Sequence, residues 1–521
     1  MELCLMKTVQ RAATIRGREP ATQMGDRLRN WSEFRARTAR LAAGLASLGV
    51  SEGDRVAMLA LNSDRYLEWF FAVPWAGGVF VPVNTRLAAP EIAYWLNDSG
   101  STVLFIDDDF LPMLERLRQN CPQLATVIYV GDGDAPSGLR HFEALIETSS
   151  EMAPADRKGE DLAGIFYTGG TTGVSKGVML SHRNLLMNAL FVVPALGFSD
   201  QTNWLHGAPM FHLADGTASF GVTMAAGSHS FIPKFEVEAA LAAIARHRVT
   251  ASVFVPTMVN MIVNHPAVDD YDLSTLKTVL YGASPMPAAV LRRALEVLPQ
   301  VCFTHGYGQT ESGPFLSCLP PRFHDPEGPQ ADKMASIGFP HMGAEIRILD
   351  ADDHEVERGT VGEICARAPN VMLGYWNKPE LTAETLRNGW LHTGDGGYMD
   401  EDGFLYIVDR VKDMIISGGE NVYSAEVENA LYKHPAVLEC AVIGVPDDKW
   451  GERVHAIVRL KPDSSVNAEG LIGHCHELIA GYKCPRSLEF RDDPLPLSGA
   501  GKILKSELRK PYWEGQAKQV H

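Results

Sequence analysis

The feature that most constrains this chain is the segment Tyr167–Gly177, which reads Tyr-Thr-Gly-Gly-Thr-Thr-Gly-Val-Ser-Lys-Gly. It continues the apolar run Ala163–Tyr167, which predicts a strand. A strand that opens into glycines, hydroxyl side chains and one lysine offers backbone N–H groups and a cation to a polyphosphate. The segment is not a Walker A loop, because Lys176 is followed by Gly177 and not by serine or threonine. The sequence therefore predicts a polyphosphate-binding loop of another kind.

Five further short motifs follow the loop in order, and they are Tyr281–Pro285, Gly306–Glu311, Thr393–Asp395, Asp409–Asp413 with Gly418–Asn421, and Ser498–Lys502. Together with the loop they resemble the ordered motifs of the adenylate-forming enzymes. That family includes acyl-CoA synthetases, adenylation domains of peptide synthetases and beetle luciferases. The resemblance covers about residues 30–510. Two loop positions depart from the family pattern, since Gly169 replaces a serine and Ser175 replaces a proline, while Lys176 is kept.

The resemblance implies a role for each matching position. The ATP-binding positions lie in the loop and in the middle motifs, and they are Thr168, Gly169, Gly170, Thr171, Thr172, Gly173, Lys176, Gly282, Ala283, Ser284, Gly306, Tyr307, Gly308, Gln309, Thr310, Asp395 and Arg410. Tyr307 offers a flat face to adenine, and Asp395 can accept hydrogen bonds from both ribose hydroxyls. Glu311 and Thr168 are the implied Mg²⁺ ligands, because both supply hard oxygen atoms.

The implied catalytic residues are Lys502, Glu311 and His212. His212 ends the segment Pro209–His212, which resembles the lining of the family's acyl pocket. It either orients the acid's carboxylate or packs as an ordinary pocket histidine. Lys412 is the implied hinge. The implied CoA-side positions are Gly418, Gly419, Glu420, Asn421 and Trp450, although Trp450 also fits a plain hydrophobic surface.

The resemblance implies an acyl-CoA synthetase that uses ATP, Mg²⁺ and CoA. Such an enzyme converts a carboxylic acid into acyl-AMP and pyrophosphate, and then transfers the acyl group to CoA. Three alternatives stay open: an enzyme that loads the acid onto a carrier protein, a luciferase-like oxygenase, and an inactive nucleotide-binding module. The acid pocket is expected to draw on His212, Thr257, Ala283, His305 and Gly306. Small residues there are expected to leave room for the acid, so fatty, aromatic and short substituted acids all stay open.

Helical segments such as Glu236–His247 alternate with short apolar runs, which predicts an α/β fold with largely parallel strands in a large, multi-layered N-terminal domain. Short strands with frequent glycine predict a small β-rich subdomain over about residues 335–409. From residue 410 the pattern is that of compact α+β structure. We therefore expect a large domain over 1–409 and a small, mobile C-terminal domain over 410–521 that carries Lys502. Ser32 and Ser424 are each expected to cap a helix, the first of which ends at Gly49.

Composition excludes several classes of protein. The 521 residues include 47 basic and 64 acidic side chains, so the formal net charge is −17. This balance argues against a nucleic-acid binder. The sequence contains no run of 18 apolar residues, and its N-terminus lacks the apolar core of a secretory signal, so we expect no integral membrane segment and a cytoplasmic location. The expected partners are small molecules, namely a carboxylic acid, ATP and CoA, and a homodimer is left open.

Overall fold

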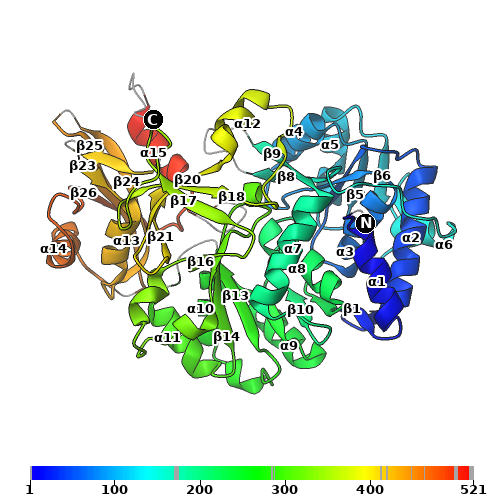
Figure 1. The fold of residues 1–521 in the computed structure, drawn as a ribbon, viewed down its shortest axis with the longest axis horizontal. Helices are drawn as coiled ribbons and strands as arrows, with labels where there is room; N and C mark the ends of the chain where they lie inside the picture. Colours follow the sequence, from blue (N-terminus) through cyan, green and yellow to red (C-terminus); the bar gives the residue numbers. More distant parts are fainter. Residues whose placement is uncertain are drawn as a thin grey trace. The chain divides into compact units, whose positions relative to one another are not determined.

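The computed structural model describes residues 3–168, 175–282, 286, 288–410, 413–417, 420–447, 449–462, 464–497 and 503–514. The chain forms two compact units (Figure 1). The first comprises Met1–Glu345 and Ala366–Leu391, and the second comprises Ile346–Cys365 and His392–His521. The expected domain boundary at 409/410 lies inside the second unit, and it remains a prediction.

The first unit contains two sheets built largely of parallel strands, as the alternating pattern predicts. One sheet has the order β19-β9-β8-β4-β3-β5-β6-β7, and its antiparallel pairs are β8 with β9 and β9 with β19. Its strands are β3 (Arg55–Leu59), β4 (Val79–Pro82), β5 (Val103–Ile106), β6 (Thr126–Tyr129), β7 (Arg140–His141), β8 (Leu162–Thr168), β9 (Lys176–Ser181) and β19 (Gly374–Tyr375).

The other sheet of the first unit has the order β16-β15-β14-β13-β12-β10-β11-β1-β2. Strands β10 to β14 and β1 run parallel, while β2, β15 and β16 pair antiparallel with their neighbours. The strands are β1 (Pro20–Met24), β2 (Arg27–Asn30), β10 (Asn203–His206), β11 (Ser228–Phe231), β12 (Ala251–Val253), β13 (Thr278–Gly282), β14 (Cys302–Tyr307), β15 (Ser317–Leu319) and β16 (Phe339–Pro340).

Helices cover and separate these sheets. They are α1 (Met6–Arg16), α2 (Trp31–Ser47), α3 (Asp64–Trp75), α4 (Ala89–Ser99), α5 (Leu114–Asn120), α6 (Phe142–Glu147), α7 (His182–Leu196), α8 (Leu213–Ala225), α9 (Val237–His247), α10 (Pro256–Val263), α11 (Ala288–Val297) and α12 (Pro379–Thr385). Short 3₁₀ helices are η1 (Leu111–Met113), η2 (Val268–Asp270), η3 (Thr310–Ser312), η4 (Pro321–Phe323), η5 (Ala331–Ala335) and η6 (Arg387–Gly389).

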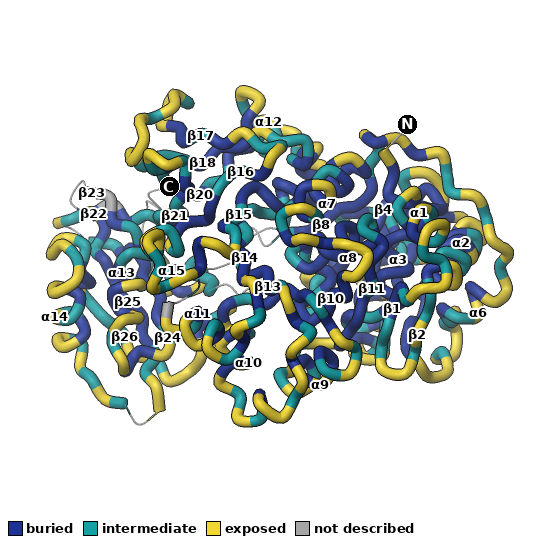
Figure 2. The backbone as a smooth tube through the Cα atoms, turned by 60° about the horizontal axis from the view of Figure 1, so that its bottom comes forward, coloured by how far each residue is buried: buried dark blue, intermediate teal, exposed yellow. Residues whose placement is uncertain are grey.

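Helix α3 lies between the two sheets, since it contacts β4 of one and both β1 and β11 of the other. All of its residues are buried (Figure 2). The Phe70 ring packs edge-on against Phe80 of β4, with centroids 5.1 Å apart, and also against Phe220 of α8 at 5.6 Å. One apolar core therefore joins both sheets, which keeps the strand ends in a fixed arrangement within this unit.

The second unit also contains two sheets. The first has the order β17-β18-β20-β21, formed by β17 (Glu345–Leu349), β18 (Gly362–Arg367), β20 (Leu391–Met399) and β21 (Leu405–Arg410). The other has the order β23-β22-β25-β24, with β26 beside β25, and comprises β22 (Ile415–Ser417), β23 (Glu420–Val422), β24 (Val437–Asp447), β25 (Gly451–Leu460) and β26 (Ser487–Phe490). Helices α13 (Ser424–Tyr432), α14 (Ala468–Leu478) and α15 (Lys505–Trp513) complete this unit.

Two expected helix caps are wrong. Helix α2 begins two residues earlier than expected, and Asn30, not Ser32, caps it: the Asn30 side chain accepts from Glu33 N at 2.9 Å, and Glu33 accepts from Asn30 N at 2.8 Å. Ser424 is the first residue of α13, and Tyr423 is in the capping position; the backbone N–H and the hydroxyl of Ser424 both donate to the Asp409 carboxylate. Gly49, with φ of +90°, follows the end of α2 as expected.

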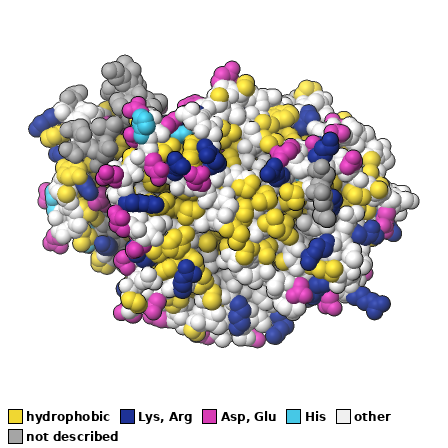
Figure 3. Space-filling model, viewed as in Figure 1, with side chains coloured by type: hydrophobic (Ala, Val, Ile, Leu, Met, Phe, Trp, Pro, Cys, Tyr) yellow, Lys and Arg dark blue, Asp and Glu magenta, His cyan; other side chains and the backbone are white. Residues whose placement is uncertain are grey.

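On the face drawn in Figure 3, basic and acidic side chains are interspersed among hydrophobic ones, and neither sign of charge dominates. Among the described residues, none of the helices combines the length and the apolar character that crossing a bilayer requires.

Candidate functional site

The expected phosphate loop connects two paired strands. Thr168 ends β8, Lys176 begins β9, and the two residues lie opposite each other in the antiparallel register. The β8 residues Ala163–Tyr167 are buried, which confirms the expected strand before the loop. The loop positions Gly169, Gly170, Thr171, Thr172 and Gly173 lie outside the described residues. The pairing of Thr168 with Lys176 nevertheless brings the two ends of the motif together at one end of the strand pair.

Lys176, Tyr375 and Glu311 form one contact set in the first unit. The Lys176 ammonium lies 4.8 Å from the centre of the Tyr375 ring, a cation–π contact. The Tyr375 hydroxyl donates to Glu311 Oε1 at 2.8 Å. Burial, with the charge of Glu311 beside it, raises the pKa of the Tyr375 phenol, so the hydroxyl keeps its proton and stays a donor. A cation and a carboxylate are thus held against one neutral phenol.

Tyr375 is absent from the sequence-based site. Strand β19 brings it there, because Tyr375 pairs with Val178 of β9, two residues after Lys176. The backbone N–H of Met372 also donates to the Glu311 carbonyl at 2.9 Å. The sequence offers only a weak signal for this residue, a tyrosine between Gly374 and Trp376, and nothing local ties it to Lys176 or Glu311.

Glu311 is held by a tight turn after β14. It lies in η3, is 7% exposed, and is flanked by Gly308 and Gly313 at positive φ. A side chain at Gly308, where φ is +154°, would place its Cβ 1.7 Å from the Pro314 carbonyl oxygen, so only glycine fits. A buried carboxylate with one oxygen bound to a phenol retains lone pairs for a hard cation, so the chemistry of Glu311 fits Mg²⁺. Its partnership with Thr168 remains a prediction.

The expected adenine side lies at the carboxyl ends of β13 and β14. Gly282 and Gly306 are opposite each other in the parallel register, and a Cβ on Gly282 would lie 2.4 Å from the Gly306 carbonyl oxygen. Tyr307, the next residue of β14, is 8% exposed, and its role as the adenine platform remains a prediction. Gln309 caps η3 and Thr310 begins it. Ala283 and Ser284 lie outside the described residues.

The structure gives His212 a clear local task. It is the N-cap of α8, and its Nδ1 accepts from the backbone N–H of Ala214 at 3.2 Å. Because Nδ1 is an acceptor, the neutral ring carries its proton on Nε2. This capping contact fixes the orientation of the ring. Both roles expected for His212, orienting the carboxylate and packing in the pocket, remain predictions.

Gly306 does not create room for the acid in the direction of its missing side chain. Its Cβ would lie 2.9 Å from the Phe315 ring and 3.0 Å from Leu280, so protein atoms already fill that space. His305 is buried and stacks on Tyr281, with centroids 4.6 Å apart, and burial lowers its pKa to about 4. Thr257, on α10, is exposed. The expected acid-pocket residues therefore include a neutral, packed histidine and one exposed hydroxyl.

In the second unit, two of the expected ATP-binding positions, Asp395 and Arg410, lie opposite each other on neighbouring strands. Asp395 of β20 is paired in register with Arg410 of β21, although 15 positions separate them in the sequence. Asp395 is 9% exposed, and its N–H donates to the Thr393 hydroxyl at 3.1 Å. The Arg410 side chain and the hinge residue Lys412 lie outside the described residues.

The segment that carries Lys502 also lies outside the described residues, but its flanks are fixed. Leu497 and Ile503 form an antiparallel bridge, and Leu504 N donates to the Pro496 carbonyl at 2.8 Å. Three residues beyond Lys502, the Lys505 ammonium contacts the half-buried Glu428 at 2.8 Å. Burial lowers the pKa of this ammonium, but the charges of Glu428 and Asp409 outweigh that effect and raise it, so Lys505 stays cationic.

The expected CoA-side residues are described only in part. Gly418 and Gly419 lie outside the described residues, and of Glu420 and Asn421 the backbone alone is described, in strand β23. Trp450 is half-buried, and two cations lie over its ring, Lys449 at 4.6 Å and Arg486 at 4.4 Å. Arg486 is a residue that the sequence did not single out, and it gives the Trp450 surface a basic character suited to a phosphorylated ligand.

Comparison with known proteins identifies the relatives of this chain. The model of the AMP-binding enzyme family matches residues 9–376, and the model of the AMP-binding enzyme C-terminal domain matches residues 426–502. A feruloyl-CoA synthase from an Amycolatopsis species is 40% identical over 505 residues, which cover 96% of this chain and 98% of that protein. A fatty acid–[acyl-carrier-protein] ligase, ScoC, from Streptomyces coeruleorubidus is 36% identical over 517 residues, which cover 96% of this chain and 95% of that protein.

Among solved structures, the anthranilate CoA ligase AuaEII in complex with anthranoyl-AMP superposes with a TM-score of 0.89 at 28% identity. The match covers 98% of this chain and 97% of that one. The fold similarity therefore extends over both units, and the sequence relatives span nearly the whole chain.

Proposed function

The chain belongs to the AMP-binding enzyme family, and from this premise we propose that it is an ATP-dependent acyl-CoA synthetase whose acid substrate is aromatic. The observation that carries the activation chemistry is the set formed by Lys176, Tyr375 and Glu311. It combines a cation for phosphate oxygens with a carboxylate for a hard metal ion on one rigid part of the first unit.

In the first half-reaction, a carboxylate oxygen of the acid attacks the α-phosphorus of ATP, and the bond to the bridging oxygen of the β-phosphate breaks. Pyrophosphate leaves and acyl-AMP remains. Negative charge accumulates at the reacting phosphate, so positive groups must offset it. Lys502 is our candidate for that contact and Lys176 for the outer phosphates. Mg²⁺, held by Glu311 and Thr168, would supply further positive charge at the phosphate oxygens.

In the second half-reaction, the thiol of CoA loses its proton and its sulfur attacks the acyl carbonyl carbon, after which AMP leaves. Lys502 has no task in this step. We propose that the C-terminal domain turns about Lys412 and brings Gly418, Gly419, Glu420 and Asn421 to the thiol's path. Lys449 and Arg486, which lie over Trp450, are suited to the phosphates of CoA.

The aromatic acid class rests on the relatives. The 40% identity to a feruloyl-CoA synthase exceeds the 34–36% identity to the fatty acid ligases, over similar lengths. The anthranilate CoA ligase also acts on an aromatic acid and shares the fold of the whole chain. We therefore favour a hydroxycinnamic or benzoic acid over a long-chain fatty acid.

A pyrophosphate-release assay on a panel of acids tests this proposal. The panel contains ferulate, benzoate, anthranilate, octanoate and palmitate, each with ATP and Mg²⁺. We expect kcat/KM for the best aromatic acid to exceed that for palmitate by at least about tenfold. A preference for a fatty acid would reject the aromatic class and keep the ligase. Absence of pyrophosphate with every acid would favour an inactive nucleotide-binding module.

A carrier protein is the second candidate for the acyl acceptor, because the relative ScoC carries its acyl group to an acyl-carrier protein. The two acceptors are distinguished by measuring which of them receives the acyl group. Acyl-AMP formed in place is offered either free CoA or a phosphopantetheinylated carrier protein at equal concentration. Faster thioester formation with free CoA supports the synthetase, and the reverse supports the loading enzyme. Light emission in the presence of oxygen would identify the luciferase-like alternative.

Two further expectations concern the setting of the protein, and we carry them forward as proposals. One is a cytoplasmic location, which cell fractionation tests. The other is a homodimer, for which light scattering coupled to size-exclusion chromatography measures the mass in solution against the 57.0 kDa chain.

A further inference from the structure

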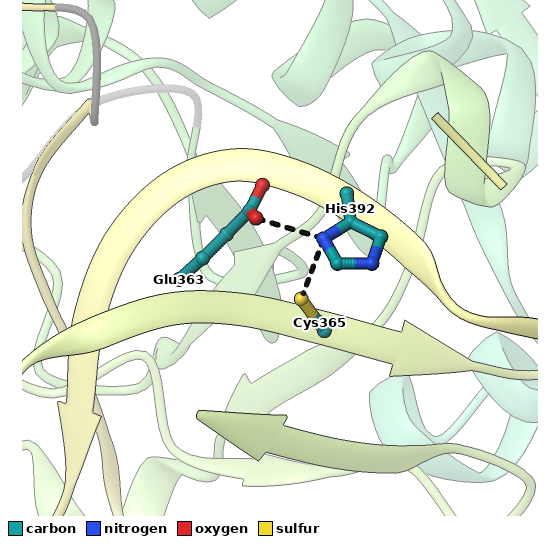
Figure 4. A group of neighbouring side chains, drawn as sticks. All are labelled: Glu363, Cys365 and His392. Carbon is teal, nitrogen blue, oxygen red and sulfur yellow. Dashed lines mark hydrogen bonds and ion pairs between the residues drawn. The ribbon is translucent and has the colours of Figure 1, made fainter. Parts of the chain in front are cut away.

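Three side chains outside the recognised motifs meet beside the Thr393–Asp395 motif. Glu363 and Cys365 lie two residues apart on β18, so their side chains share one face, and His392 lies on the neighbouring strand β20 (Figure 4). His392 Nδ1 is 2.8 Å from Glu363 Oε2 and 3.3 Å from Cys365 Sγ. The side chain of His392 is 3% exposed, and Cys365 is fully buried.

The Glu363 carboxylate holds the backbone that presents Asp395. Its Oε1 accepts from the N–H of Gly394 at 2.9 Å, while its Oε2 accepts from the ring of His392. One side chain therefore binds two points of this β20 segment, namely His392 and Gly394. Gly394 has φ of +72°, a conformation that glycine adopts without strain but that other residues rarely adopt.

Thr393 adds a second attachment to the same strand. Its hydroxyl donates to the carbonyl of Ile364 at 2.6 Å and accepts from the N–H of Asp395 at 3.1 Å. The β20 segment from His392 to Asp395 is thus attached to β18 through Glu363 and through Thr393. This arrangement fixes the backbone from which the Asp395 carboxylate projects.

We propose that Glu363 is a positioning residue for nucleotide binding, which acts by holding the His392–Asp395 segment of β20 so that Asp395 meets the ribose hydroxyls. The proposal rests on the proposed function, in which Asp395 binds ribose. A carboxylate suits this task because it accepts two hydrogen bonds at once in a fixed geometry, and charge strengthens both. Histidine provides one donor and a rigid ring, which limits the freedom of the segment further.

The same three side chains offer sulfur, nitrogen and oxygen atoms that all lie within 4.8 Å of one another, which is also the donor set of a zinc site. In the structure, however, the ring nitrogen and the carboxylate oxygen already satisfy each other through a hydrogen bond. A zinc site needs the Cys365 sulfur as a ligand, whereas the positioning role rests on the two hydrogen bonds that Glu363 accepts and does not require the thiol. Cys365 therefore separates the two interpretations.

The experiment measures the Kd of ATP and of 2′,3′-dideoxy-ATP for the full chain by calorimetry. Glu363→Ala should raise the Kd of ATP about tenfold, and Glu363→Gln, which conserves volume and one acceptor, about threefold. With dideoxy-ATP the ribose hydroxyls are absent, so the same substitutions should change the Kd by less than about twofold. Glu363→Ala combined with Asp395→Asn should weaken ATP binding no more than Asp395→Asn alone.

Three controls accompany these variants. Glu355→Ala removes an exposed carboxylate of the same unit that pairs with Arg347, and it should leave both Kd values unchanged. Cys365→Ala should also leave the Kd of ATP within about twofold, and the purified protein should hold no stoichiometric zinc. Melting temperatures show whether each variant is folded, and Glu363→Gln serves if Glu363→Ala does not fold.

Two results would overturn the positioning role. Equal weakening of ATP and dideoxy-ATP binding would mean that Glu363 only supports the fold, and one equivalent of zinc that is lost in Cys365→Ala would identify a metal site. A different result concerns the proposed function alone: if Asp395→Asn itself binds ATP and dideoxy-ATP as the wild type does, Asp395 is not the ribose ligand.

Discussion

At the scale of single residues, Tyr375 connects the two charged groups expected to meet the phosphates and the metal ion. Its ring faces the Lys176 ammonium, and its hydroxyl fixes one oxygen of Glu311. A neutral phenol can do both because the raised pKa keeps its proton in place at the pH of any assay. The orientation of the proposed metal ligand therefore depends on a residue that carries no charge.

Replacing Tyr375 with phenylalanine tests this dependence. The ring and its cation–π contact remain, but Glu311 loses its donor. We expect the Mg²⁺ concentration for half-maximal pyrophosphate release to rise about three- to tenfold, while the KM for the acid stays unchanged. Tyr406→Phe is the control, because that hydroxyl donates to Asp400 in the second unit. Unchanged Mg²⁺ dependence in Tyr375→Phe would show that Glu311 needs no such support.

Lys502 is expected to matter in only one of the two half-reactions. Lys502→Ala should slow acyl-AMP formation by about 100- to 1,000-fold, the effect of one lost contact to a developing charge. Given pre-formed acyl-AMP and CoA, the same variant should still form thioester. Lys510→Ala, which removes an exposed lysine paired with Glu507, is the control. Rapid-quench measurements of each half-reaction decide, and equal loss in both would refute the assigned role.

At the scale of elements, helix α3 shows how a buried helix accommodates charge. Asp64 and Glu68 are fully buried in it, and arginines from two neighbouring elements reach them: Arg27 and Arg29 of β2 and Arg37 of α2. The sequence gives α3 an apolar and aromatic majority, but its place between two sheets requires that its acids be neutralised inside the protein. The ion pairs meet that requirement.

Removing one arginine should reveal the cost of such a buried charge. Arg37 binds Glu68 at 2.6 Å and Glu143 at 2.7 Å, so Arg37→Ala should lower the free energy of unfolding by about 3 kcal/mol. Arg35→Ala, on the same helix, breaks a half-exposed pair with Glu151 and should cost less than about 1 kcal/mol. Urea unfolding followed by tryptophan fluorescence compares the two variants. Equal losses would contradict the view that burial sets the cost.

At the scale of the whole molecule, the expected nucleotide-side and CoA-side residues are distributed over both units. Lys176, Tyr375 and Glu311 belong to the first, whereas Asp395, the flanks of Lys502 and the Trp450 surface belong to the second. A reaction with two chemically different steps can use such a division, because one unit can bring different residues to the reacting atoms in each step. The proposed rotation about Lys412 would make this change.

Lys412→Pro tests the rotation. Proline fixes φ at about −65° and restricts the preceding residue, so the backbone of the hinge should lose its freedom to change conformation. We expect a pyrophosphate burst of near-normal size and little acyl-CoA, because the adenylating arrangement is the one that keeps Lys502 at the nucleotide. A thermal melt reports on folding. Intact folding together with intact thioester formation would refute the rotating-domain mechanism.

The sequence by itself was enough to place the elements and motifs that depend on neighbouring residues. The strand before the phosphate loop and helix α9 lie where the periodicity predicts them, because periodicity is a local property. The family and its chemistry also follow from contiguous motifs. Even at this scale errors occurred: the caps at Ser32 and Ser424 were wrong, since Asn30 competed for one and the distant Asp409 for the other.

Only the tertiary structure decided which distant residues support those motifs. Tyr375 meets Glu311 across 64 positions, Glu363 meets Gly394 across 31, and Arg486 reaches Trp450 across 36. No sequence pattern singles out Tyr375, Glu363 or Arg486. Strand pairing and packing bring them into contact with the motifs, and both depend on the whole chain. The sequence thus predicted which groups perform the chemistry, and the fold determined what holds them, since a hydrogen bond requires proximity in space and not along the chain.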